Sequence, residues 1–162
     1  MNFVLLADEP AAATTVARWY FDEWGAESPG VTIEKVIKQV SLASSRETAP
    51  LIVLAKKDGN VIGAAELKIR EMKIYPDYEY WIGGVYIHSE ERGLGVGSLL
   101  VRNVLGRAAA AGIRTLYLQT MDLTGGIYAR LGFQPVEQVN YAGTDVLVMS
   151  MNFSDSASCG VS

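Results

Sequence analysis

Apolar positions recur along the chain with two different periods. The spacing i, i+3, i+4, i+7 of an amphipathic helix is found at Ile33, Val36, Ile37 and Val40. Thr32 is a suitable N-cap for this helix, which we expect over residues 33–44. Three further helices are expected, over residues 7–24, 98–111 and 124–131.

Shorter apolar runs between turn residues predict strands. The run at residues 51–55 precedes Asp58-Gly59, a hairpin signal, and residues 61–69 are its expected partner strand. Further strands are expected over residues 80–87, over residues 115–120, and as a pair within residues 133–151 around the turn at 141–144. The order of helices and strands predicts an α/β domain with a mixed sheet.

Length and composition narrow the class of protein. The 162 residues favour one domain, which we place over residues 1–151, followed by a flexible tail over residues 152–162 that contains Cys159. One histidine and one cysteine are too few for a His- or Cys-based metal site or an internal disulfide, so we expect no metal. A net charge of −4 argues against a nucleic-acid partner. No apolar run is long enough for a membrane span, and no signal peptide is evident, so we expect a cytoplasmic protein without a membrane partner.

The most informative segment joins a strand to a helix through a loop in which Gly93, Gly95 and Gly97 alternate with other residues. Glycine lets the backbone adopt turns that a side chain forbids, and it lets a ligand come close. The N–H groups at the helix start then point outward beside the positive end of the helix dipole, which makes a phosphate cradle. Arg92 adds a fixed positive charge beside it.

Three phosphate-binding patterns compete for this loop. A Walker A loop needs a lysine, and the loop has none. A dinucleotide fingerprint needs its third glycine where Ser98 or Leu100 stands, depending on the register. The pattern Arg/Gln-x-x-Gly-x-Gly/Ala is matched in full by residues 92–97. A plain strand-to-helix turn is the remaining alternative.

With this loop, the chain resembles the GNAT superfamily of acetyl-CoA-dependent N-acetyltransferases. Residues 128–133 are similar to the Tyr-x-x-x-Gly-Phe segment of that family. Residues 81–87 and 116–120 resemble two strands of uncharacterised bacterial small-molecule acetyltransferases, with Ile87 in place of a final valine. The resemblance covers residues 50–150 or so. It implies a mixed, mostly antiparallel sheet of about six or seven strands, with helices on both faces and a splay between the two central strands.

The resemblance also implies which residues bind acetyl-CoA, the expected cosubstrate. Backbone groups of Val85 and Ile87 would contact the pantetheine arm, and an N–H group within Val85–Tyr86 would meet the oxyanion. The pyrophosphate would be held by the loop residues Arg92, Gly93, Leu94, Gly95, Val96, Gly97 and Ser98. Tyr128 would protonate the departing thiolate; a core aromatic packed against Phe133 or Leu131 is the alternative interpretation.

Other residues of the site keep two interpretations. Gly83-Gly84 predicts a bulge that splays its strand from the next, or tight packing under a helix. Glu79 is our candidate for the general base, with Glu66, an ordered water or a backbone carbonyl as alternatives. His88 is more typical of an incidental strand end. The aromatic residues of the first helix belong to the core or line an acceptor cleft with one face: Trp19, Tyr20, Phe21 and Trp24.

These expectations combine into one function and one alternative. An N-acetyltransferase would move acetyl from acetyl-CoA to a primary amine of a small molecule or peptide, and a homodimer is compatible with the resemblance. The alternative is an acyl-CoA-binding sensor, which would need the glycine loop but neither Tyr128 nor an acceptor pocket. Five carboxylates are candidates to face a cationic acceptor: Glu66, Glu71, Asp77, Glu79 and Asp122.

Overall fold

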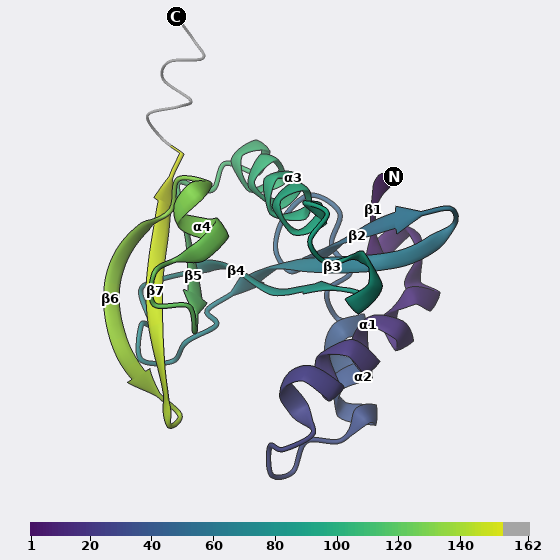
Figure 1. The fold of residues 1–162 in the computed structure, drawn as a ribbon, viewed down its shortest axis with the longest axis horizontal. Helices are drawn as coiled ribbons and strands as arrows, with labels where there is room; N and C mark the ends of the chain where they lie inside the picture. The colour runs from purple at the N-terminus through teal and green to yellow at the C-terminus, as the bar shows by residue number, and fades with distance from the viewer. Residues whose placement is uncertain (154–162) are drawn as a thin grey trace, which may run out of the picture.

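The computed structural model describes residues 1–153, which form one seven-stranded sheet in the order β1-β2-β3-β4-β5-β7-β6 (Figure 1). The strands are β1 (Asn2–Leu5), β2 (Leu51–Lys57), β3 (Asn60–Ile69), β4 (Tyr80–Ile87), β5 (Thr115–Thr120), β6 (Gln134–Tyr141) and β7 (Thr144–Asn152). The α-helices are α1 (Ala13–Tyr20), α2 (Ile33–Ser41), α3 (Val96–Ala110) and α4 (Gly126–Arg130). Short helical turns of other types are η1 (Leu6–Asp8), η2 (Pro10–Ala12), η3 (Phe21–Gly25) and η4 (Ser89–Glu91).

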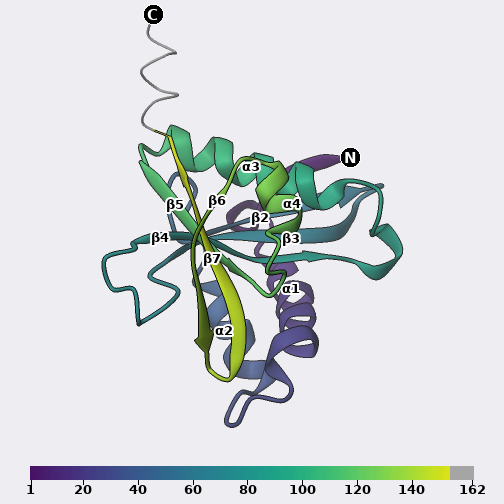
Figure 2. The ribbon, with the colours of Figure 1, turned by 60° about the vertical axis from the view of Figure 1, so that its left-hand side comes forward.

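The sheet is mixed but mostly antiparallel, as the sequence predicts. Every neighbouring pair is antiparallel except β4 and β5, which run parallel. The strands on the two sides of this parallel pair run in clearly different directions (Figure 2). The sheet is therefore divided, at β4 and β5, into two antiparallel halves.

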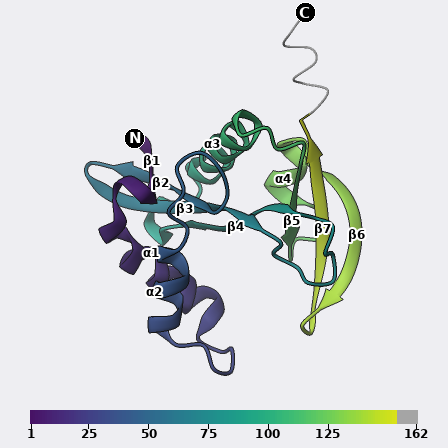
Figure 3. The ribbon, with the colours of Figure 1, turned by 180° about the vertical axis from the view of Figure 1, so that it is seen from behind.

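Helices cover both faces of the sheet, which confirms the expected fold class. Figures 1 and 3 show α3 and α4 on one side and α1 and α2 on the other. The interior strand β2, between β1 and β3, is buried along Leu51–Ala55, and its residues alternate between the two faces. Val53 packs in the core beneath α3, whereas Ile52 packs in the core beneath α1 and α2. This double burial explains why β2 is a continuous apolar run rather than an alternating one.

The structure differs from the sequence-based expectation at one strand and two helices. β1 was not expected, because four residues carry little pattern until they pair with the edge of β2. The helix expected over residues 7–24 is divided into η1, η2, α1 and η3, and Pro10 begins one of the divisions. The helix expected over residues 33–44 ends at Ser41, although Thr32 caps it as predicted, since Thr32 Oγ1 accepts a hydrogen bond from Lys35 N–H at 3.2 Å.

The packed domain extends two residues beyond its expected end at residue 151. β7 continues through Asn152, and Phe153 N–H donates to Arg114 O at 2.8 Å, so two residues assigned to the tail belong to the packed structure. The rest of the expected tail, with Cys159, lies outside the described residues. Within residues 1–153, the helices are too short or too polar to cross a membrane.

Candidate active site

The two central strands separate almost as soon as they meet. β4 and β5 share one paired position, Trp81 with Tyr117, and beyond it the edge of β4 that faces β5 is open. On the other edge, β4 pairs with β3 through a register shift between Ala64 and Glu66. One residue of β3 there opposes two of β4, so β4 carries the predicted bulge at Gly84.

Both glycines of the bulge are explained by their neighbours. Gly84 has a φ of +57°, and a Cβ atom there would lie 2.5 Å from the hydroxyl oxygen of Tyr20. That hydroxyl donates a hydrogen bond of 2.6 Å to Gly84 O, which the bulge releases from the strand ladder. A Cβ atom on Gly83 would lie 2.5 Å from Glu71 Oε1. The bulge and the close approach of a helix, which the sequence offered as alternatives, therefore occur together.

The open edge of β4 presents backbone groups of the predicted residues. His88 N–H donates to Ile62 O at 2.8 Å, so strand alternation turns the peptide groups of Ile87, and of Val85 two residues earlier, away from β3. The side chain of Tyr86 faces the α1 side of the sheet, where it stacks on Trp19 with ring centroids 5.1 Å apart. Val85 and Ile87 thus face the splay with their backbone, while Tyr86 contributes to the aromatic layer behind it.

The glycine loop leads directly into α3. Gly93 and Gly95 have φ angles of +81° and +83°, which only glycine adopts without strain, and a Cβ atom on either would meet open space. α3 begins at Val96, two residues earlier than predicted, and no side chain caps its first turn within the described structure. Its first N–H groups, at Val96, Gly97 and Ser98, therefore lack intrahelical partners. This is the geometry of an anion cradle.

Other loop residues have separate roles. Arg92 is exposed; its Nε donates to Ile87 O at 2.8 Å, and its guanidinium lies 5.1 Å from the ring centroid of Tyr86. The side chain of Arg92 thus braces the loop against the end of β4. Leu94 is 67% exposed, whereas Val96 is buried in the core.

A cavity of about 480 Å³ occupies the splay between β4 and β5. Gly83 and Val85 of β4, Gln119 of β5 and Tyr128 of α4 are among its lining residues. Burial, together with the charge of Glu71, raises the pKa of the Tyr128 hydroxyl above its ordinary value. Tyr128 also packs edge-on against Phe133, with ring centroids 6.1 Å apart. Tyr128 is thus packed on Phe133 and also lines the cavity.

A second cavity, of about 430 Å³, lies between β3, β4 and the helical layer of α1 and α2. Tyr20 and Gly84 are part of its wall, and Glu66 of β3 faces it. Burial raises the pKa of Glu66 to about 7, although Lys68 opposes this shift. Within residues 1–153, no side chain makes a hydrogen bond or an ion pair with the carboxyl group of Glu66. The group is therefore largely desolvated and faces an open volume.

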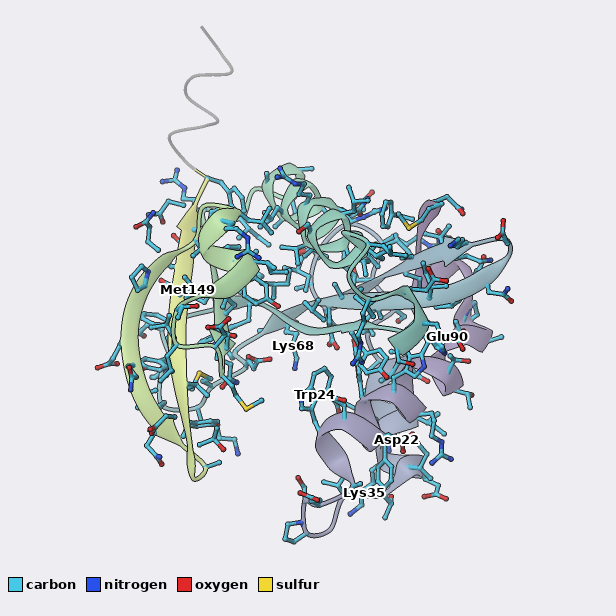
Figure 4. The ribbon with its side chains drawn as sticks, viewed as in Figure 1. Asp22, Trp24, Lys35, Lys68, Glu90 and Met149 are labelled. Atoms are coloured by element: carbon cyan, nitrogen blue, oxygen red, sulfur yellow. The ribbon has the colours of Figure 1, made fainter. Side chains whose placement is uncertain are left out.

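Lys68 and Trp24 line both cavities, so the two volumes meet at these side chains. Figure 4 shows Trp24 projecting from the end of η3 toward Lys68 on the sheet. Lys68 Nζ donates to Glu71 Oε1 at 2.9 Å, and Glu71 Oε2 accepts from Gln119 Nε2 at 3.0 Å. These three side chains connect β3 to β5 across the place where Gly83 leaves room. Nothing in the sequence indicates Lys68 or Gln119 as site residues, because their partners are set by the splay.

Glu79 lies apart from both cavities. Its carboxylate is about half exposed and pairs with Arg70 Nη2 at 3.4 Å. The structure therefore does not bring Glu79 to Tyr128, whereas Glu66 faces the cavity that adjoins that of Tyr128. The expectation that five carboxylates face the acceptor is likewise not met, because Asp77, Glu79 and Asp122 line neither cavity.

His88 makes a local hydrogen bond at the end of β4, and it belongs to no group of metal ligands in the described part of the chain. His88 Nδ1 accepts from Glu90 N–H at 3.2 Å at the start of η4, a local turn contact. Among residues 1–153, no three His, Cys, Asp or Glu side chains are grouped to hold a metal ion.

Comparisons with known proteins agree with this geometry. A model of the acetyltransferase (GNAT) family matches residues 12–133. The solved structure of a ribosomal-protein-alanine N-acetyltransferase from Brucella melitensis is 18% identical, with a TM-score of 0.74 and coverage of 94% of this chain and 99% of that one. An N-acetyltransferase from Staphylococcus aureus Mu50 is 16% identical, with a TM-score of 0.74 and coverage of 95% and 100%. An aminoglycoside 6'-N-acetyltransferase complexed with coenzyme A is 15% identical, with a TM-score of 0.72 and coverage of 94% and 97%. A search of curated proteins finds no match.

Proposed function

The chain belongs to the acetyltransferase (GNAT) family, and we propose that it transfers an acetyl group from acetyl-CoA to a primary amine. The family membership gives acetyl transfer and the acetyl-CoA donor. The amine acceptor and the roles of individual residues are our proposal, and they rest on the two adjoining cavities and on the groups that face them.

The chain's own groups fit coenzyme A along one continuous path. The first N–H groups of α3, after Gly95, would receive the pyrophosphate at the positive end of the helix. The outward peptide groups of Ile87 and Val85 would pair with the amides of the pantetheine arm, in place of the missing strand neighbour. This path ends at the cavity in the splay, beside Tyr128.

Glu66 is the general base in this proposal. A protonated amine is not a nucleophile, so the acceptor must lose a proton before it attacks the thioester carbonyl. A carboxylate with a pKa of about 7 holds that proton near neutral pH far better than an ordinary glutamate does. Glu66 lies on the α1–α2 side of β4, so the acceptor approaches from the side opposite to coenzyme A.

Tyr128 is the general acid. The amine nitrogen forms a bond to the carbonyl carbon, the carbon–sulfur bond breaks, and the sulfur leaves as a thiolate that needs a proton. Because burial raises the pKa of Tyr128, its hydroxyl keeps a proton to give at neutral pH. The single observation that carries the proposal is the pairing of these groups: a largely desolvated carboxyl in one cavity and a partly buried phenol in the other, where the cavities meet beside the β4 bulge.

The binding-sensor alternative requires neither group. A sensor needs a place for coenzyme A but has no use for an acceptor cavity with a carboxyl of raised pKa. The presence of both therefore favours turnover over sensing.

A thiol-release assay across an amine panel tests the proposal. Polyamines, aminoglycosides, amino acids and peptides are offered with acetyl-CoA, and the acetylated product is identified. At least one class should accelerate thiol release, and Glu66→Gln and Tyr128→Phe should each lower kcat about a hundredfold or more. Glu79→Gln is the comparison variant that separates the two candidate bases. If no amine accelerates release while coenzyme A still binds, the sensor alternative is correct.

A further inference from the structure

We propose that the acceptor is an amine whose far end carries an anionic group, with an apolar segment between the two, and that Lys35 binds the anion. This inference rests on the proposed function and names the substrate class of the same site. It follows from the composition of the acceptor cavity, which is the 430 Å³ volume in front of Glu66.

The charges that line this cavity are unevenly divided. Two are cationic, Lys35 and Lys68, and one is a carboxyl, Glu66. Lys68 already pairs with Glu71, which does not line this cavity. Lys35 stands on the first turn of α2, at the other end of the lining from the sheet residues (Figure 4). At the sheet, Glu66 lines the cavity beside Lys68, whose charge is paired with Glu71, and Lys35 is the cation at the α2 end.

Lys35 has spare capacity for a ligand. Its side chain is exposed, and Nζ donates one hydrogen bond of 2.8 Å, to Gly30 O. No carboxylate of residues 1–153 lies within ion-pair distance of it. An ammonium group has three donors, so two remain for an incoming anion. The acidic residues of the neighbouring segments do not line the cavity: Asp22, Glu23, Glu27 and Glu34.

The wall between the two ends is mostly apolar, and Ser28 and Gln39 are its polar side chains. Its apolar part is formed by Tyr20, Trp24, Val31, Val36 and Val40. Trp24 is 46% exposed and Val31 is 37% exposed, which leaves large apolar surfaces facing the cavity. A hydrocarbon or aromatic segment of an acceptor would bury these surfaces, and it would set its amine at Glu66 when its anion is at Lys35.

A polycation fits this cavity poorly. An aminoglycoside or polyamine would bring further positive charges toward Lys35, and Glu66 is the one carboxyl among the lining residues. Although similar folds include an aminoglycoside acetyltransferase, the charges of this acceptor cavity point to a different acceptor.

Three probes with the same spacer test the inference: ω-aminohexanoate, hexylamine and α,ω-diaminohexane, each with its butyl and octyl homologues. At the best spacer length, kcat/KM should be highest for the amino acid, lower for the monoamine and lowest for the diamine. The kcat/KM values for the amino acid and the diamine should differ roughly tenfold. The amino acid gains an attraction to Lys35 and the diamine suffers a repulsion from it, and each has the strength typical of a surface ion pair. Added salt should shrink the difference.

Variants of two lysines on the same helix identify the source of the preference. Lys35→Gln should reduce the preference to about twofold, and Lys35→Glu should reverse it in favour of the diamine. Lys38→Gln is the matched control, because Lys38 is exposed on α2 but does not line the cavity, and it should keep the full preference.

The outcomes separate this inference from the proposed function. A wild type that prefers the diamine, or a Lys35→Gln variant that keeps the preference, overturns the inference while amine acetylation stands. Best turnover of polyamines or aminoglycosides in the broad panel overturns it in the same way. Failure of every amine, with coenzyme A still bound, overturns the proposed function itself.

Discussion

Replacing Glu66 with glutamine should stabilise the protein at the pH where it removes activity. Burial raises the pKa of Glu66 from 4.5 to about 7, so the folded state holds a proton that the unfolded chain releases. Between these two values the folded state binds more protons, and stability therefore falls as pH rises. Glutamine has no proton to lose, and the variant escapes this cost.

The size of the effect follows from the shift. A displacement of about 2.5 pKa units corresponds to roughly 3 kcal/mol of unfolding free energy once the pH is above 7. Most of this, roughly 2.5 kcal/mol, should develop between about pH 5 and about pH 8. The unfolding free energy of the variant should therefore increase by that amount relative to the wild type between these two pH values. This change is large compared with a typical domain stability of about 5–15 kcal/mol.

Urea denaturation of both proteins at the two pH values measures this gain without substrate. Glu79→Gln is the control, since it removes an exposed ion pair with Arg70 and should change the unfolding free energy by about 1 kcal/mol or less at either pH. Parallel behaviour of the wild type and Glu66→Gln across the interval would refute the desolvated carboxyl on which the proposed base depends.

Three further predictions concern the coenzyme. Coenzyme A at about 100 times its Kd should stabilise the fold by roughly 2.7 kcal/mol, seen as a rise of several degrees in Tm by calorimetry; no rise at millimolar concentration contradicts the donor site. Gly95→Val should weaken coenzyme A binding in a folded protein, because φ is +83° there; unchanged affinity by titration calorimetry would move the cradle elsewhere. Arg92→Ala should weaken coenzyme A and a phosphate-free pantetheine analogue equally, because Arg92 holds Ile87 O; a larger loss for coenzyme A would instead indicate direct phosphate contact.

The backbone conformation of the loop proposed to bind coenzyme A can be predicted from the sequence, because the parts of that loop are local. The loop from Arg92 to Gly97 joins consecutive elements. Its glycines predict positive φ angles, which Gly93 and Gly95 adopt. Gly83-Gly84 likewise marks the bulge within a single strand. Such features depend on backbone conformation, which residue type reports directly.

The acceptor side depends on contacts between distant segments. The sequence made Glu79 the candidate base, but Glu79 precedes β4 and pairs with Arg70. Glu66 acquires its raised pKa from burial under the helical layer of α1 and α2, and a single glutamate in a strand carries no signal of that packing.

The helical layer of α1 and α2 also combines local features, which the sequence predicts, with long-range contacts, which it does not. Thr32 predicts the start of α2 through a local hydrogen bond, and that prediction is confirmed. The contact of Tyr20 with Gly84 joins residues 64 positions apart, and it could not be predicted from helix periodicity. The features that could not be predicted from the sequence are therefore those that tertiary packing determines.

The pH dependence of kcat/KM for amine acetylation tests the central claim most directly. A base at Glu66 must be ionised to accept the proton, so the rate for the wild type should rise with pH through a midpoint near 7. This step lies well below the acceptor amine's own ionisation, near pH 10 for an alkylamine such as lysine. Glu66→Gln should be slower by about a hundredfold or more and should lack the step. A variant that keeps the wild-type profile and rate would contradict the account, because the proton would then leave the acceptor by another route.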